Sequence, residues 1–158
     1  MNRENWKIYA FWIGLSEAAG ILSGIISRSG QIIFSQEVIQ PPFSPPGWVF
    51  PVVWSILYAL MGIGAARIYL GAPSSARNQG LNLFVTQLIV NFFWSPIFFN
   101  AQAFGLAFLW LVLLWTLVVL MILSFRKTDK TAAQLQLPYL LWLTFAAYLS
   151  FGVWYLNQ

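Results

Sequence analysis

Five segments of about 20 residues each, rich in apolar side chains and almost free of charge, make up most of this chain. A helix of that length crosses the roughly 30 Å hydrocarbon core of a bilayer. Backbone polar groups must be paired in lipid, so a spanning segment is a helix or a strand of a closed barrel, and barrel strands are about half as long. The sequence therefore predicts an all-α integral membrane protein, a bundle of five transmembrane helices in a single domain at residues 1–158. The predicted spans cover residues 6–26, 48–70, 80–99, 104–125 and 135–155.

The composition excludes several classes of function. Only 8% of the residues are charged and 59% are hydrophobic, whereas a soluble domain carries about 25% charged residues. The chain has no cysteine and no histidine, which excludes disulfides, thiolate or imidazole metal ligands, and catalysis by either side chain. The net charge of +4 comes from basic residues near segment ends, where membrane topology explains them. We therefore expect no metal site, no required cofactor and no nucleic-acid partner.

Lysine and arginine gather on one side of the predicted bundle. The N-terminus and the second and fourth links share that side, and the opposite side carries only Arg28. Positive residues favour the cytoplasmic side. We expect an integral protein of a bacterial plasma membrane with the N-terminus in the cytoplasm and the C-terminus outside; in an organelle the same bias would point to its interior or to the cytosol. The residues on the basic side are Arg3, Lys7, Arg67, Arg77, Arg126, Lys127 and Lys130.

One carboxyl, Glu17, lies in the middle of the first span. Ionisable residues at this depth are costly and often functional. Gly14, Gly20 and Gly24 share its helical face, and small residues let helices pack closely, so we expect Glu17 to point into the bundle. Two interpretations stay open: a hydrogen bond across a helix contact or into a hydrated cavity, or a role in ligand or proton handling. The glycine face is also one candidate for a dimer contact.

The links between spans carry different signals. Residues 27–40 are polar, and five prolines follow between positions 41 and 51. Proline fixes its own backbone and restricts the residue before it. We therefore expect a stiff lid over the outer mouth of the bundle. Residues 71–75 and 100–102 are expected to be turns, and residues 126–134 a loop.

Aromatic residues form 18% of the chain, with nine tryptophans, and some fall inside spans at helical spacing. If their faces converge, they line an apolar pocket suited to a large flat ligand. On spacing alone, ordinary packing between helices is the better explanation of the same pattern. The residues concerned are Trp54 and Tyr58 in the second span, Asn91, Trp94 and Phe98 in the third, and Trp142, Phe145 and Ala146 in the fifth.

Three sequence runs resemble the TspO/MBR family of tryptophan-rich sensory proteins, which are related to the mitochondrial translocator protein, the peripheral benzodiazepine receptor. They are PPGWVFPVVWSILY at residues 45–58, NFFWSPIFF at 91–99, and PYLLW at 138–142. The resemblance extends over essentially the whole chain in the family's order.

This resemblance implies a five-helix bundle that forms a homodimer, with a pocket under the first loop. It implies binding of porphyrins and haem-like tetrapyrroles, sterols and benzodiazepine-type drugs, and for some bacterial members light-dependent breakdown of protoporphyrin. The implied ligand-binding residues are Phe43, Trp48, Trp54, Asn91, Trp94, Phe98, Trp142, Phe145 and Ala146.

The first loop departs from the family pattern. The family has a Trp-Tyr pair and a Lys-Pro-x-Trp run, where this chain has Phe34-Ser35 and residues 40–43, Gln-Pro-Pro-Phe. The lid therefore lacks a cation and several indoles. A basic residue after Tyr155, which the sterol motif proposed for the family requires, is absent as well.

We expect a membrane receptor or sensor-type protein for porphyrins and other apolar ligands. Two alternatives remain. One is light-dependent porphyrin degradation, an enzymatic activity for which Trp54 and Trp142 are the candidate electron-exchanging residues. The other is transport of tetrapyrroles or sterols, although the chain shows no evident inverted repeat.

Overall fold

The computed structural model describes residues 2–158, and these residues form helices and connecting loops without a β-strand. Each of the five predicted spans coincides with a long apolar helix, so the predicted all-α membrane bundle is confirmed. Three shorter helical segments accompany them. The long helices are α1 (Asn5–Ile26), α3 (Val49–Leu70), α4 (Ser75–Ser95), α5 (Phe104–Thr128) and α7 (Leu137–Leu156); the short ones are α2 (Arg28–Glu37), the π-helical η1 (Pro96–Asn100) and α6 (Lys130–Gln134).

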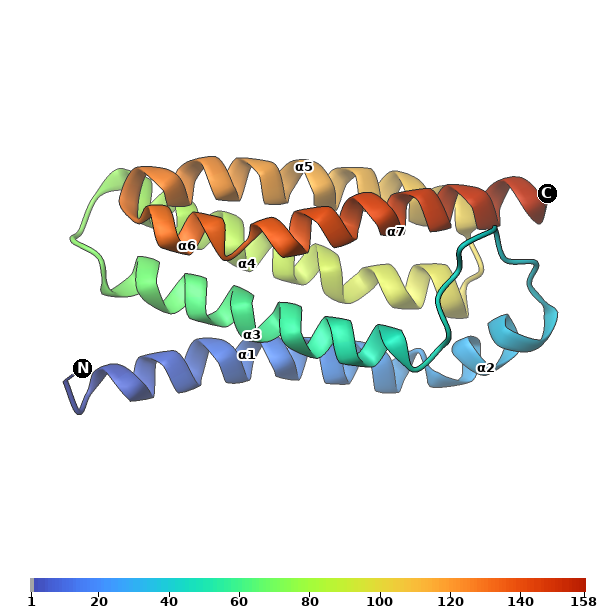
Figure 1. Cartoon of the computed structure of the whole chain (residues 1–158), viewed down its shortest axis with the longest axis horizontal. Helices are drawn as coiled ribbons and strands as arrows, with labels where there is room; N and C mark the ends of the chain where they lie inside the picture. The colour runs from blue at the N-terminus through green and yellow to red at the C-terminus, as the bar shows by residue number, and fades with distance from the viewer. Residues whose placement is uncertain (1) are drawn as a thin grey trace.

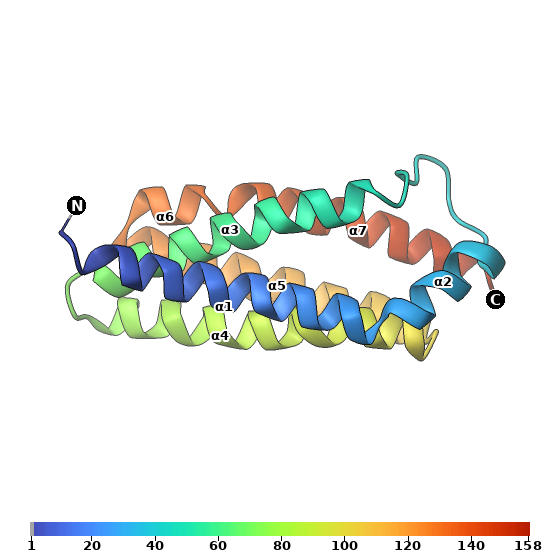
Figure 2. The same ribbon diagram turned by 90° about the horizontal axis from the view of Figure 1, so that it is seen from below.

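The long helices run side by side along the length of the molecule (Figure 1). The N-terminus, the α3–α4 link and the α5–α6 link lie at one end, and α2, the loop that follows it and the C-terminus lie at the other (Figure 1). Seen from below, α1 lies between α3 and α4, with α5 behind it (Figure 2). The basic residues of the N-terminus and of the second and fourth links thus share one end of the bundle.

α1 and α3 approach each other closely at Gly62, where an added Cβ would collide with the backbone of Trp12 and Ile13. The predicted packing face of α1 is correct only at Gly20, which lies against the ring of Tyr58. Added Cβ atoms at the other two glycines of that face, at positions 14 and 24, would meet no described atom within 4 Å. Besides Gly20, the contact between α1 and α3 thus depends on a small residue of α3, which lies outside the stripe that the sequence suggested.

The polar stretch after the first span is helical and not a plain loop, because α2 covers Arg28–Glu37. One side of α2 packs on η1: Gly30 meets the backbone of Phe99, and the ring of Phe34 lies 5.3 Å from the rings of both Phe98 and Phe99. The remaining residues of α2 are mostly exposed and polar, so hydropathy alone gave no sign of it.

Side-chain caps set two helix starts that hydropathy missed. The Ser74 Oγ accepts a 3.1 Å hydrogen bond from the Arg77 N–H, so α4 begins within the segment expected to be a turn. The expected loop at residues 126–134 is also mostly helical, since Asp129 caps α6 by accepting from the Ala132 N–H at 3.0 Å. The other Asp129 oxygen pairs with Arg67 at 2.8 Å, which joins α6 to α3.

A proline inside the third span creates an unusual junction between α4 and η1. Pro96 has no N–H to donate to the carbonyl of Phe92, four residues earlier, and an unpaired carbonyl is expensive in lipid. The Ser23 Oγ of α1 donates to that carbonyl at 2.7 Å. A hydrogen bond between helices therefore replaces the one that proline removes within the helix.

Replacing Ser23 with Ala should lower the free energy of unfolding by about 1 kcal/mol, because the Phe92 carbonyl loses its partner. Thermal unfolding in detergent, followed by circular dichroism, measures the change. Thr116→Ala is the matched control, since its hydroxyl bonds only to the Val112 carbonyl of its own helix. In a Pro96→Ala background, Ser23→Ala should lower the free energy of unfolding by less, because the substituted alanine supplies the missing N–H. An equal decrease in both backgrounds would contradict this account.

Candidate ligand-binding cavity

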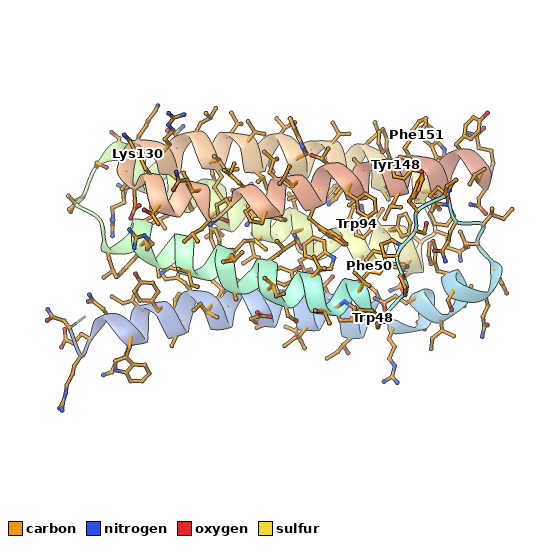
Figure 3. All side chains as sticks on the ribbon, viewed as in Figure 1. Trp48, Phe50, Trp94, Lys130, Tyr148 and Phe151 are labelled. Carbon is orange, nitrogen blue, oxygen red and sulfur yellow. The ribbon has the colours of Figure 1, made fainter. Side chains whose placement is uncertain are left out.

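A cavity of about 830 Å³ lies in the half of the bundle that holds α2 and the C-terminus. Its walls come from α1, α2, α3, α4 with η1, α5 and α7, and the loop between α2 and α3 contributes Gln40 and residues 44–47. Phe50 and Trp94 lie between α3 and α7 in Figure 3, far from Lys130 at the opposite end. The aromatic part of the lining comprises Phe34, Phe50, Trp54, Tyr58, Trp94, Phe98, Phe99 and Trp142.

Most of the site residues expected from the sequence meet in this cavity. Glu17 lines it from α1, on the side where α1 faces Tyr58. The others in the lining are Trp54, Asn91, Trp94, Phe98, Trp142 and Ala146.

Three of the expected residues are not among the described residues that line the cavity. Phe43 has a left-handed backbone (φ 67°), and its side chain is 87% exposed. Trp48 is 69% exposed at the start of α3, and Phe145 packs between Trp142 and Tyr148 beside the cavity. A role for these three in binding stays a prediction.

The floor of the cavity is a chain of buried hydrogen bonds from α3 through α4 to α7. The Tyr58 hydroxyl donates to Asn91 Oδ1, the Asn91 Nδ2 donates to the Tyr139 hydroxyl, and that hydroxyl donates to Gln87 Oε1, each at 2.7 Å. Both ends of the Asn91 amide are therefore engaged with protein. Asn91 thus links Tyr58 to Tyr139, and its side-chain carbonyl and one amino hydrogen are already bonded within the bundle.

Tyr139 and Gln87 are the members of this chain that the sequence did not indicate. Gln87 lies one turn before Asn91 on α4, so its spacing placed it on the same face as Asn91. Both side chains are fully buried, as expected for polar groups whose hydrogen bonds are satisfied within a protein.

The three cavity tryptophans differ in what their indoles do. Trp94 donates from Nε1 to the Ala107 carbonyl at 3.2 Å and stacks on Phe98, with ring centroids 4.8 Å apart. Trp54 stacks on Tyr58 at 5.4 Å, and Trp142 packs edge-on against Phe50 at 5.8 Å. The indole N–H groups of Trp54 and Trp142 donate to no other described residue. Trp94 is thus a fixed wall, whereas the other two can donate to a ligand.

The loop over the cavity is fastened to α7 at successive points. The Ile39 N–H donates to Asn157 Oδ1 at 3.0 Å, and Asn157 Nδ2 donates back to the Ile39 carbonyl at 2.8 Å. Pro41 is buried against Gly152, where an added Cβ would lie 2.6 Å from the proline Cβ. The Tyr148 hydroxyl donates to the Pro42 carbonyl at 2.8 Å, and Figure 3 shows Tyr148 beside this loop. The prolines and these contacts together make the loop a fastened lid.

The cavity carries few charges. Among the described residues of its lining, Glu17 is the single acid and Arg28 the single base. Within residues 2–158 no three Asp or Glu side chains gather where they could hold a metal ion. The chemistry available is therefore stacking, hydrogen bonding from indoles, one carboxyl and one guanidinium group.

Five apolar helices and a lidded aromatic cavity at one end of the bundle define an integral membrane protein. Comparison with known families is specific: residues 12–156 match the model of the TspO/MBR family. The chain belongs to that family.

Individual relatives agree with this assignment. The chain is 36% identical over 158 residues to the tryptophan-rich protein TspO of Chlorobaculum tepidum, covering 99% of both chains. It is 38% identical over 121 residues to the translocator protein of Ovis aries, covering 75% of this chain and 72% of the relative. It is 35% identical over 118 residues to the tryptophan-rich sensory protein of Cereibacter sphaeroides, covering 75% and 73%.

Asn157→Ala should free the lid without disturbing the bundle, because it removes the side chain that bonds both the N–H and the carbonyl of Ile39. Loss of both bonds, at about 1 kcal/mol each, should make hydrogen exchange at the Ile39 amide roughly 30-fold faster. Mass spectrometry of peptides covering residues 38–44 measures it. Ser35→Ala, which removes an exposed bond to the Ile32 carbonyl within α2, is the control and should leave the Ile39 amide unchanged. Equal protection in wild type and Asn157→Ala would show that the asparagine does not hold the lid.

Proposed function

We propose that this protein is a membrane receptor or sensor-type protein that binds porphyrins and other flat apolar ligands in its aromatic cavity. The observation that carries the proposal is the cavity of about 830 Å³, lined mainly by aromatic rings and covered by a lid. Sites for small molecules and cofactors typically occupy about 300–1,000 Å³ and are mostly apolar with a few polar groups.

The tryptophans suit a flat ring system. Trp54 and Trp142 come from α3 and α7, and each is partly buried and contributes to the lining. Stacked or edge-to-face contacts between aromatic rings add about 0.5–1.5 kcal/mol beyond the burial of area. The free indole N–H groups add hydrogen bonds to acceptors on the ligand.

The names of the relatives point the same way. Relatives are called translocator proteins and tryptophan-rich sensory proteins, which supports a receptor or sensor role in the membrane for this chain. The chain has no histidine or cysteine to bind iron, so recognition would depend on the ring's shape and faces. We expect metal-free porphyrin to bind at least as well as haem.

Replacing both Trp54 and Trp142 with Phe should weaken protoporphyrin binding about tenfold or more, through loss of indole area and of two hydrogen-bond donors. Titration of the quenching of the remaining tryptophan fluorescence by protoporphyrin and by haem, in nanodiscs, gives the dissociation constants. Trp6→Phe is the control, because Trp6 is exposed at the opposite end of the bundle. Unchanged affinity in the double variant would defeat the proposal.

We also propose that the basic end of the bundle faces the cytoplasm, since positive residues favour that side. The chain has no cysteine, so single cysteines can be introduced without background. In intact bacterial cells, an impermeant maleimide should label Gln158→Cys and not Asn2→Cys; the reverse pattern would invert the orientation.

The homodimer implied by the resemblance also remains a prediction, which disulfide cross-linking through Gly14→Cys on the open face of α1 can probe.

A further inference from the structure

Glu17 is a carboxyl of the cavity that binding of a neutral ring does not explain. It lies in the middle of α1, is partly exposed, and is the single acid among the described residues of the lining. A carboxyl at this depth of a membrane is costly unless it has a partner.

Three hydroxyls on α1 and on the facing α3 are committed to other partners. Ser16 donates to the Trp12 carbonyl at 2.8 Å, and Ser23 donates to the Phe92 carbonyl at 2.7 Å. Tyr58, which faces this stretch of α1 at Gly20, donates to Asn91. The carboxyl of Glu17 itself accepts no hydrogen bond from any described residue.

The cation of the cavity lining is too distant to serve as its partner. Arg28 lies eleven residues further along, which at 1.5 Å per residue corresponds to about 16 Å along the helical path of α1 and α2. The described residues hold one salt bridge, between Arg67 and Asp129, and it lies at the other end of the bundle. A partner for Glu17 would thus have to come from the occupant of the cavity.

The wall beside Glu17 leaves room for such an occupant. Gly20 and Gly24 follow it on the same side of α1, and both line the cavity. An added Cβ at Gly24 would meet no described atom within 4 Å, so a ligand can approach the helix backbone there. At Gly24 the wall of α1 is therefore open backbone, on the same side of the helix as one unpaired carboxyl.

We propose that the cavity selects apolar ligands that carry a protonated amine, whose ammonium group pairs with Glu17 while the ring system packs against Trp54 and Trp142. This inference rests on the proposed binding function of the cavity and adds the chemical class of the ligand. A charge-assisted hydrogen bond is shorter and stronger than a neutral one, and the low polarity of the site strengthens it further. The same carboxyl disfavours acidic substituents near α1, so acidic groups of a bound porphyrin lie away from this wall.

A matched pair of probes tests the selection. 1-Pyrenemethylamine and 1-pyrenemethanol share one flat ring system and differ in the charge of the substituent. Their dissociation constants are measured by quenching of tryptophan fluorescence in phosphatidylcholine nanodiscs, for wild type and Glu17→Gln. We expect Glu17→Gln to weaken the amine at least tenfold and to change the affinity for the alcohol less than twofold.

Two further variants separate charge from structure. Glu17→Asp keeps the carboxyl and should retain part of the preference for the amine. Glu4→Gln removes a carboxyl just before α1, outside the cavity lining, and should leave both affinities unchanged.

The inference is overturned if Glu17→Gln leaves the amine's affinity unchanged, or if it weakens both probes equally, which is the mark of a structural role. Protoporphyrin binding in the same nanodiscs keeps the two proposals apart. If wild type binds protoporphyrin and pyrenemethanol but shows no dependence on Glu17 for the amine, this inference fails alone. If wild type binds none of the three, the proposed function of the cavity fails with it.

Discussion

The membrane's demand that every backbone polar group be paired shapes this structure more than any single side chain does. It limits the chain to long helices, and wherever a helix is interrupted it requires a replacement partner. The clearest case is the carbonyl of Phe92, which Pro96 leaves open and Ser23 satisfies from another helix. That bond ties α1 to α4 at the level of the cavity, so the interruption that gives η1 its altered geometry also fixes the position of the cavity's wall. Phe98 and Phe99, which η1 carries, then support α2.

The cavity lies between a hydrogen-bonded floor and a lid that is bonded to α7. Two tyrosines from different helices hold the Asn91 amide, and Trp54 stacks on one of them. At the other side, Asn157 bonds both backbone groups of Ile39. Between this floor and the lid, the indole N–H groups of Trp54 and Trp142 and the carboxyl of Glu17 make no hydrogen bond with described residues. They are therefore available to an occupant of the cavity. The proposed binding therefore depends on the few polar groups that make no hydrogen bond within the protein.

Much of this arrangement could be predicted from the sequence, for identifiable reasons. Spans were predictable because apolar length reflects bilayer thickness. Trp54, Trp94, Phe98 and Trp142 of the cavity lining were predictable because they recur at helical spacing within runs that resemble a known family, whereas Phe34, Phe50 and Phe99 were not predicted as site residues. The starts of α4 and α6 were missed because Ser74 and Asp129 act as caps in polar segments, where hydropathy carries no signal. The position of α2 depends on its contact with η1, far away in the sequence. The roles of Tyr139 and Gln87 depend on how α4 and α7 are rotated relative to each other, which spacing along one helix does not define.

The floor network has a consequence for how selectivity can vary among related proteins. Gln87 and Tyr139 are not among the described residues of the cavity lining, yet they hold Asn91, Asn91 holds Tyr58, and Tyr58 supports the face of Trp54. A substitution at Gln87 or Tyr139 would therefore reorient the indole of Trp54 in the cavity wall, while every lining residue stays the same. Two members of such a family could share an identical set of ligand-facing residues and still prefer different ligands, and a comparison restricted to those residues would not reveal the difference.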